Sequence, residues 1–148
     1  MAISSCLVDS NVLLRLALRD SPDHRVVRTA VASLQSGNAQ LFFTHQNISE
    51  FWNVATRPKE QNGFGLSVDE VEREVKGIER GLTFLPDSEA LYREWRRVVT
   101  AYQVRGLQVH DARLAAAMLV HNVPHILTLN VEDFKRYQGI TAVHPNTV

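Results

Sequence analysis

The stretch CLVDSNVLLRL, residues 6–16, decides the fold class. Three apolar residues come first, Asp9 follows them directly, and a segment with apolar residues at helical spacing runs from Asn11 to Leu18. A short apolar run that gives way at once to a helical pattern is typical of a buried β-strand followed by a helix. We therefore predict a strand over residues 6–8, with Asp9 at its carboxyl end.

The same alternation continues along the chain, and each further strand is short and apolar. The predicted strands are Gln40–Thr44, Thr83–Leu85, His125–Thr128 and Thr141–Val143. The predicted helices are His24–Gln35, Gln46–Thr56, Ser67–Arg80, Asp87–Val104, Asp111–Val120 and a short turn at Glu132–Tyr137. Short apolar strands separated by helices favour a parallel sheet covered on both faces. The predicted class is α/β, with three layers around a short central parallel sheet.

The composition fits one compact domain over residues 1–148, since no repeat and no linker divides the chain. Its hydrophobic share of 45% is too high for a disordered chain. Sixteen basic and sixteen acidic residues give a net charge of zero. This balance argues against a protein that coats nucleic acid by bulk electrostatics, but it does not exclude an enzyme that holds nucleic acid locally.

The sequence also predicts a cytoplasmic protein. Cys6 is the only cysteine, so no internal disulfide can form, and the opening residues MAISSC lack the basic and apolar regions of a signal peptide. The longest apolar run, Leu114–Val120, is far shorter than the roughly 20 residues that cross a bilayer. We expect no membrane association.

Acidic residues fall near the ends of the predicted strands. Asp9 follows the first strand, Glu50 lies about one turn into the helix after the second, and Asp111 opens the helix before the fourth. Asn130 and Asp133 follow the fourth strand. Carboxylates that meet at one sheet edge repel one another unless a cation is present, and oxygen ligands favour Mg²⁺ or Mn²⁺. Such a site can support phosphodiester hydrolysis.

Each acid also has a purely structural interpretation. Asp9 can cap the first helix, and Asp111 can be a carboxylate favoured at a helix start. Glu50 can lie on a solvated face, although Phe51 and Trp52 beside it belong to an apolar stripe. Glu132 is best interpreted as surface charge. The combination of acids, more than any single one, favours a metal site.

Four segments together resemble one known family over nearly the whole chain. They read, in order, CLVDSNVLLRL, ISEFWNVATRP, VHDARLAAAMLVHNV and ILTLNVEDFKRYQGITAVHP. In this combination the chain resembles PIN-domain ribonucleases, specifically the VapC toxins of bacterial toxin-antitoxin modules. The resemblance implies that Asp9, Glu50 and Asp111 are active-site acids and that Asn11 helps to order the site.

The fourth acidic position departs from the family pattern. Family members commonly carry Asp or Asn at the place of Asn130, and the nearest carboxylate here is Asp133. Because an Asn contributes no charge, a second metal ion would be held more weakly. We assign the fourth catalytic position to Asp133, and the metal ligands to Asp9 and Asp111.

The resemblance implies a Mg²⁺- or Mn²⁺-dependent endoribonuclease that cuts single-stranded or loop RNA and arrests translation until a cognate antitoxin blocks it. It also implies a homodimer. Several arginines could bind RNA phosphates, although each alone is more simply a solvated helix residue. These are Arg15, Arg93, Arg96, Arg97 and Arg113. Trp52 and Trp95 lie on apolar stripes, which is more typical of core residues.

Three other functions compete with this one. A haloacid-dehalogenase-like phosphatase would need a second Asp where Asn11 stands, and an Asn cannot act as its acid. The pair His110-Asp111 matches HD phosphohydrolases superficially, but those proteins are all-helical. A catalytically silent PIN-like module that binds RNA or a partner is also compatible with Asn130, although such a module has no reason to keep all of Asp9, Glu50 and Asp111.

Overall fold

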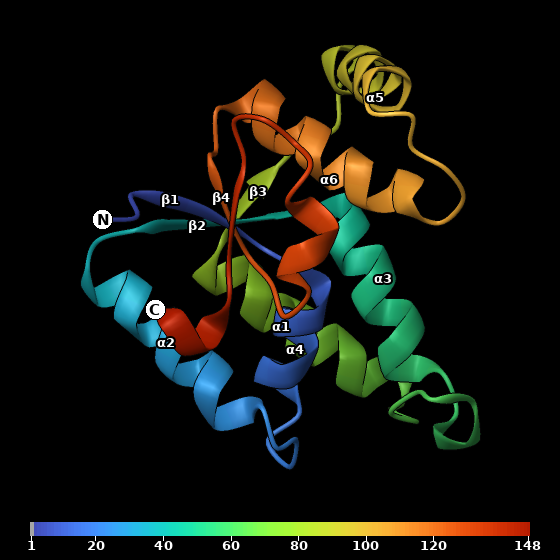
Figure 1. Cartoon of the computed structure of the whole chain (residues 1–148). Coiled ribbons are helices and arrows are strands. Elements are labelled where there is room, and N and C mark those ends of the chain that lie inside the picture. The colour runs from blue at the N-terminus through green and yellow to red at the C-terminus, as the bar shows by residue number, and fades with distance from the viewer. Residues whose placement is uncertain (1) are drawn as a thin grey trace.

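The computed structural model describes residues 2–148, which form one sheet with helices around it (Figure 1). The strands are β1 Ser5–Val8, β2 Gln40–Thr44, β3 Thr83–Leu85, β4 His125–Leu127 and β5 Thr141–Val143. The helices are α1 Ser10–Ala17, α2 His24–Ser36, α3 His45–Thr56, α4 Val68–Gly81, α5 Glu89–Ala101 and α6 Gln108–His121. Short 3-10 turns span Lys59–Gln61, Val131–Phe134 and Pro145–Thr147.

The five strands lie in the order β3-β2-β1-β4-β5, and every neighbouring pair is parallel. Leu7 at the centre of β1 is in register with Phe42 of β2 and Ile126 of β4. The backbone N–H of Asp9 continues this pairing by donating to the Leu127 carbonyl at 3.0 Å. The strand order reverses beside β1, and the carboxyl ends of the strands share one edge, which is where α/β sheets form binding crevices.

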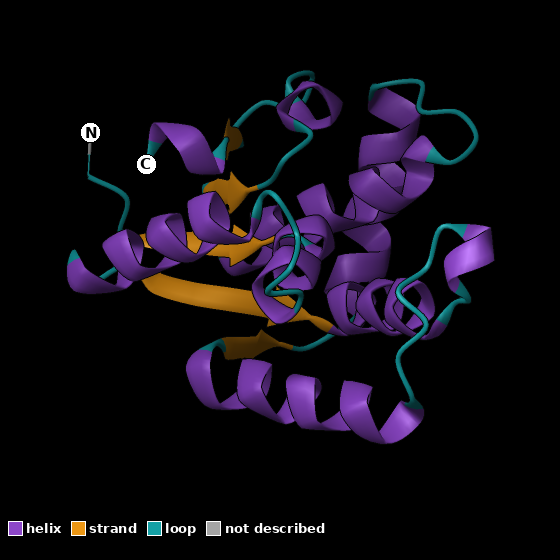
Figure 2. Ribbon diagram, turned by 90° about the horizontal axis from the view of Figure 1, so that it is seen from below, coloured by secondary structure: helices purple, strands orange, loops and turns teal. Residues whose placement is uncertain are grey.

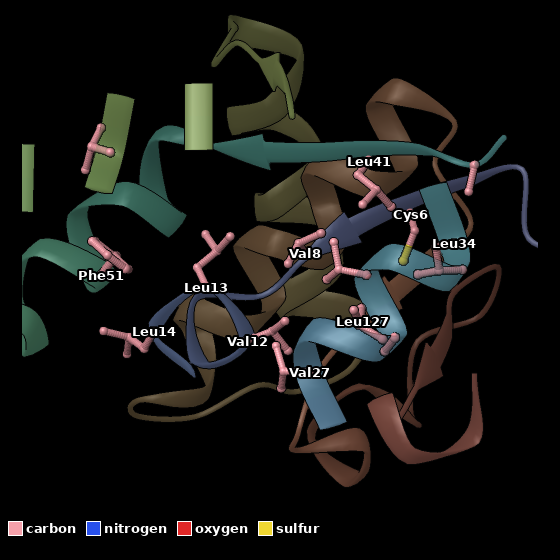
Figure 3. Packing of buried hydrophobic residues seen from close by; sticks show 14 of the residues in the cluster. Cys6, Val8, Val12, Leu13, Leu14, Val27, Leu34, Leu41, Phe51 and Leu127 are labelled. Atoms are coloured by element: carbon pink, nitrogen blue, oxygen red, sulfur yellow. The ribbon is translucent and has the colours of Figure 1, made fainter. Parts of the chain in front are cut away.

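Alternation along β1 sends its side chains into two separate cores. Cys6 and Val8 pack against α1, α2 and parts of α3 and α4 on one face, as the close-up in Figure 3 shows. Leu7 points to the opposite face, where it joins Val98 of α5 and the alanine-rich α6. Figure 2 shows helices on both sides of the strands. The three-layer α/β architecture predicted from the sequence is therefore confirmed.

Most helix boundaries lie within one residue of the predicted ones, and α5 and α6 differ by more. Helix α6 begins at Gln108, so Asp111 lies in its first turn and does not open it. Helix α5 is shorter than predicted because Ser88 caps its start and because Gln103 adopts a left-handed φ of 51° just beyond its end. Caps of this kind depend on local backbone geometry that apolar periodicity does not report.

A helix that spans a membrane needs about 20 mostly apolar residues. Within residues 2–148, no helix is long and apolar enough to cross a membrane.

Candidate active site

A pocket of about 430 Å³ opens at the carboxyl edge of the sheet. Its wall contains the four predicted acids, Asp9, Glu50, Asp111 and Asp133. Ser10, Asn11, Arg15 and Asn130 complete most of its polar lining. These residues come from the start of α1, the middle of α3, the first turn of α6 and the segment after β4. The structure thus brings together every acid that the sequence placed at the sheet edge.

Asp9 is the most buried of these acids, with 6% of its surface exposed. Its Oδ1 accepts the Ser10 N–H at 2.7 Å, so it does cap α1 as the structural interpretation expected. Its Oδ2 accepts a 2.8 Å hydrogen bond from the hydroxyl of Thr128, the residue that follows β4. Burial raises the pKa of Asp9, the bonds from Thr128 and Ser10 lower it in part, and nearby Asp133 raises it further. Capping and burial in the pocket therefore coexist in one side chain.

Two polar neighbours fix the surroundings of Asp9. The Asn11 amide donates to Oδ2 of Asp9 at 3.4 Å, and its own oxygen accepts the Leu129 N–H at 3.2 Å. The Ser10 hydroxyl lies 3.3 Å from Oδ1 of Asp9 and 3.2 Å from Oε1 of Glu50. Asn11 thus joins β1 to the segment after β4, as its predicted ordering role requires.

Sequence reasoning did not assign a site role to Ser10 or Thr128. Both are short hydroxyl residues directly beside a strand end, next to a predicted acid or at the end of an apolar run. Their position beside a strand end was the only feature of the sequence that could have indicated a role in the site. This indication is weak, because Ser and Thr are common wherever a strand passes into a turn or a helix.

Glu50 lies on the pocket wall and is half-buried, which argues against the solvated-face interpretation. Burial is the main cause that raises its pKa, and the charge of Asp9 adds to it. Hydrogen bonds from Ser10 and Gln46 and the charge of His110 act in the opposite direction. Burial beside Asp9 therefore gives Glu50 a raised pKa, which is typical of carboxylates at functional sites.

Asp111 has a strongly raised pKa. Burial raises it to about 7, with further contributions from the charges of Asp9, Asp133 and Glu50. At neutral pH the Asp111 carboxyl is therefore partly protonated, and the nearby negative charges disfavour its ionised form. A divalent cation would relieve that repulsion and displace the proton.

Both candidates for the fourth position line the pocket. Asn130 lies just before the turn Val131–Phe134, and Asp133 lies within it. Glu132, between them, is exposed and forms an ion pair with Lys135 at the surface. The interpretation of Glu132 as surface charge is thus consistent with the structure.

The chemistry of the pocket fits a hard divalent cation, because its ligand atoms are carboxylate and amide oxygens. Across residues 2–148, however, no three acidic, His or Cys side chains converge as closely as a dedicated all-protein metal site requires. Mg²⁺ commonly keeps several waters and binds through one or two carboxylates. Asp9 and Asp111, the metal ligands predicted from the sequence, both lie on the wall of this pocket.

The predicted phosphate-binding arginines are distributed unevenly. Arg15 lines the acidic pocket. Arg93 and Arg97 form ion pairs with glutamates of their own helix, and Arg113 pairs with Asp87 at 2.9 Å. The ion pairs are partly exposed and hold these side chains only weakly. Trp52 packs against the core beneath α1 to α4, and Trp95 packs against the opposite core, as the apolar stripes indicated.

The fold and the site define a class of α/β protein in which an acidic pocket lies at the switch point of a short parallel sheet. A comparison with family models matches the PIN domain over residues 6–140. The chain belongs to the PIN domain family. The family and the fold predicted from the four sequence segments are thereby confirmed. A comparison with curated protein sequences finds no match.

Solved structures with the same fold include toxin-antitoxin proteins. VapBC2 from Rickettsia felis, bound to a promoter DNA fragment, has a TM-score of 0.70 at 12% identity, covering 95% of this chain and 98% of its own. VapBC-1 from Haemophilus influenzae has a TM-score of 0.69 at 18% identity, with the same coverage. VapC20 from Mycobacterium tuberculosis, a toxin that cleaves the sarcin-ricin loop, has a TM-score of 0.59 at 10% identity, covering 82% and 86%. At these identities the likeness shows the fold.

Proposed function

We propose that this PIN domain protein is a Mg²⁺- or Mn²⁺-dependent endoribonuclease and the toxin of a toxin-antitoxin pair. The observation that carries the proposal is the meeting of four acids from separate segments in one pocket, where the pKa of Asp111 is raised to about 7. A purely structural set of carboxylates would gain nothing from such repulsion. The fold shared with a toxin that cleaves the sarcin-ricin loop supports RNA as the substrate.

The residues divide the work as follows. Asp9 and Asp111 hold the ion, which when bound polarises the scissile phosphate and stabilises its developing charge. Ser10 and Thr128 keep the Asp9 carboxylate oriented through its two oxygens. Glu50 or Asp111 positions the attacking water, and Glu50, which is not assigned to the ion and has a raised pKa, accepts its proton.

The outer part of the pocket completes the site. Asp133 takes the fourth acidic position, with Asn130 beside it as a neutral acceptor for water. Arg15 is placed to bind a substrate phosphate at the rim. The acids and one cationic side chain of the protein thus line the same pocket.

The decisive experiment incubates the protein with labelled RNA in Mg²⁺, in Mn²⁺ and in EDTA, with a phosphomonoester as a second substrate. Cleavage of RNA but not of the monoester, lost in EDTA, is expected. Asp9→Asn and Asp111→Asn should each reduce the rate by at least about a hundredfold. Glu132→Gln is the matched control, because this neighbouring acid is exposed and paired with Lys135.

Two results would contradict the proposal. Cleavage that survives both aspartate substitutions would place the activity elsewhere or in a contaminant. Binding of RNA without cleavage under any metal condition would instead identify the catalytically silent PIN-like module.

We also propose a protein partner, a cognate antitoxin, because several structures with this fold are toxin-antitoxin complexes. The same proposal includes a homodimer of this chain. Size-exclusion chromatography with light scattering should show the dimer at micromolar concentration. A strict monomer under those conditions would contradict this part of the proposal.

A further inference from the structure

A second pocket, of about 450 Å³, lies between α5 and α6, which pack side by side at one end of the molecule (Figure 1). Its walls are mostly apolar and aromatic, from Leu91, Tyr92 and Trp95 of α5 and Val109 of α6. The pocket takes no part in the metal and proton chemistry described above. Its shape and chemistry therefore need a separate explanation.

The two aromatic rings of this pocket form a fixed platform. The indole N–H of Trp95 donates to the Val109 carbonyl at 2.9 Å, which ties the ring to α6. Tyr92 lies beside it, with ring centroids 6.4 Å apart and planes inclined by 35°. Although Tyr92 packs against Trp95, 55% of its surface is exposed. A large aromatic residue left open in this way is available to a flat ligand.

The aromatic pocket is continuous with the acidic one. A third, intermediate pocket, of about 440 Å³, shares Glu50 and Asn53 with the acidic pocket. The same intermediate pocket shares His110 and Arg113 with the aromatic pocket. One groove therefore runs from the carboxylates to the aromatic platform.

Charge along this groove favours an anionic strand. Arg113 borders both the intermediate and the aromatic pocket, and Asp87 offsets part of its charge through a 2.9 Å ion pair. Arg96 lies over the Tyr92 ring at 6.0 Å and donates to its hydroxyl at 3.0 Å. Unlike Arg93 and Arg97, Arg96 has no acidic partner among the ion pairs of residues 2–148. Within those residues, the guanidinium of Arg96 is therefore a cation without an acidic partner beside the Tyr92 ring.

We propose that the aromatic pocket binds one unpaired nucleobase of the RNA strand whose phosphate occupies the acidic pocket. This inference rests on the proposed ribonuclease function and names a base-binding subsite for it. A base supplies the flat π-face that Tyr92 and Trp95 can stack against, and single-stranded RNA offers its bases for such stacking. The connecting groove carries the sugar-phosphate backbone past Arg113.

The test measures binding without chemistry. Fluorescence anisotropy in EDTA at low salt follows a labelled single-stranded RNA of about 12 nucleotides and a set of the same RNA, each with one base removed. At one position, loss of the base should weaken binding about five- to tenfold. Tyr92→Ala should weaken binding of the intact RNA by a similar factor, and removing that base should then cost nothing further.

Two control variants test whether the effect on RNA binding is specific to the Tyr92 ring. Tyr92→Phe keeps the ring and should bind intact RNA as the wild type does. Phe84→Ala removes an aromatic residue of similar exposure, 49%, from β3 on a different pocket, and should change nothing. Circular dichroism checks that each variant is folded.

The pocket proposal is overturned if intact RNA does not bind, if Tyr92→Ala leaves binding unchanged, or if it weakens intact and base-deleted RNAs equally. A change in oligomeric state on Tyr92→Ala, with RNA binding intact, would also overturn it and identify the face as a contact between protein chains. The binding test does not measure cleavage. If the wild-type protein binds RNA through Tyr92 but does not cleave it, only the proposed ribonuclease function is contradicted. If the protein cleaves RNA but binds it independently of Tyr92, only the proposed base-binding pocket is contradicted.

Discussion

Asp9 belongs both to the start of a helix and to the candidate active site, and its two carboxylate oxygens divide these tasks. Oδ1 accepts the Ser10 N–H at the start of α1, and Oδ2 accepts the Thr128 hydroxyl. A helix cap alone does not need the second bond or the near-complete burial. Asp9 therefore caps α1 and lines the acidic pocket at the same time.

Thr128→Val tests how strongly the buried carboxylate depends on its hydroxyl partner. Thr128 is fully buried and also accepts the Asn130 N–H at 3.1 Å. Replacing its hydroxyl with a methyl group leaves Oδ2 of the buried Asp9 with only the 3.4 Å bond from Asn11, and the free energy of unfolding should fall by about 2–3 kcal/mol. Urea denaturation measures this change. Thr128→Ser keeps the hydroxyl and should cost only about 1 kcal/mol for the lost methyl group, so equal losses in both variants would contradict the argument.

Asp111→Asn should stabilise the metal-free protein above neutral pH. The pKa of Asp111 is about 7 in the folded chain and 3.8 by reference, so between these values the folded state binds more protons than the unfolded state. The free energy of unfolding therefore falls as pH rises from about 4 to about 7. The substitution removes this contribution, makes the slope shallower and raises the melting temperature at pH 8 by a few degrees.

Thermal melts in EDTA at a series of pH values measure this effect. Glu132→Gln serves as the control, because Glu132 is exposed, and it should retain the slope of the wild type. Asp9 and Glu50 also have raised pKa values of the same sign, so part of the slope should remain in Asp111→Asn. A variant with an unchanged slope, or with lower stability at pH 8, would show that Asp111 is not destabilised by its neighbours.

At the scale of elements, the end of α3 depends on the loop that follows it. Phe64 and Leu66 donate their backbone N–H groups to the carbonyls of Val54 and Ala55, in the last turns of the helix. This return requires a close approach at Gly63, where an added Cβ would lie 1.9 Å from the Arg57 carbonyl oxygen. The loop therefore completes the hydrogen bonding of a helix that carries Glu50.

Gly63→Ala should destabilise the protein by about 1–3 kcal/mol, because the loop must shift away from the backbone of Arg57. Gly81→Ala is the matched control. Nothing lies within 4 Å of a Cβ at Gly81, and in the last turn of α4 an alanine should be neutral or up to about 1 kcal/mol stabilising. Denaturant titration compares the two, and equal effects would contradict the importance of the close approach.

The elements themselves were largely predictable, whereas their polar connections were not. The strands Gln40–Thr44 and Thr83–Leu85 were predicted with the bounds they have, because each is a short run of mostly apolar residues that ends at a helix or turn signal. Asp9 could be placed because it directly follows a strand, and Glu50 and Asp111 because they lie on helices next to predicted strands. The Thr128 bond to Asp9 could not, since it joins residues 119 positions apart, and no periodicity in the chain reports such a pair. The pocket beside Tyr92 also depends on how α5 and α6 pack in space.

For the whole molecule, a net charge of zero conceals an uneven distribution. Four acids line one pocket, while many of the arginines lie elsewhere and several are already paired with carboxylates of their own. A divalent cation in this pocket would offset the repulsion between the acids and an RNA phosphate. The net charge of zero therefore does not predict whether the protein binds a nucleic acid. The local charge at the acidic pocket is the relevant quantity.

This distribution predicts that divalent cations stabilise the entire fold. An ion that binds only the folded pocket should add about 2.7 kcal/mol at a hundred times its dissociation constant, or roughly 5–11 °C in melting temperature for a chain of this size. Millimolar Mn²⁺ or Mg²⁺ should produce the shift in a thermal melt, and NaCl of equal ionic strength should not. Asp9→Asn and Asp111→Asn should each lose most of it, while Glu132→Gln should keep it. If NaCl gives the same shift, or if the aspartate variants retain it, the cations act by screening surface charge and the acidic pocket does not bind them.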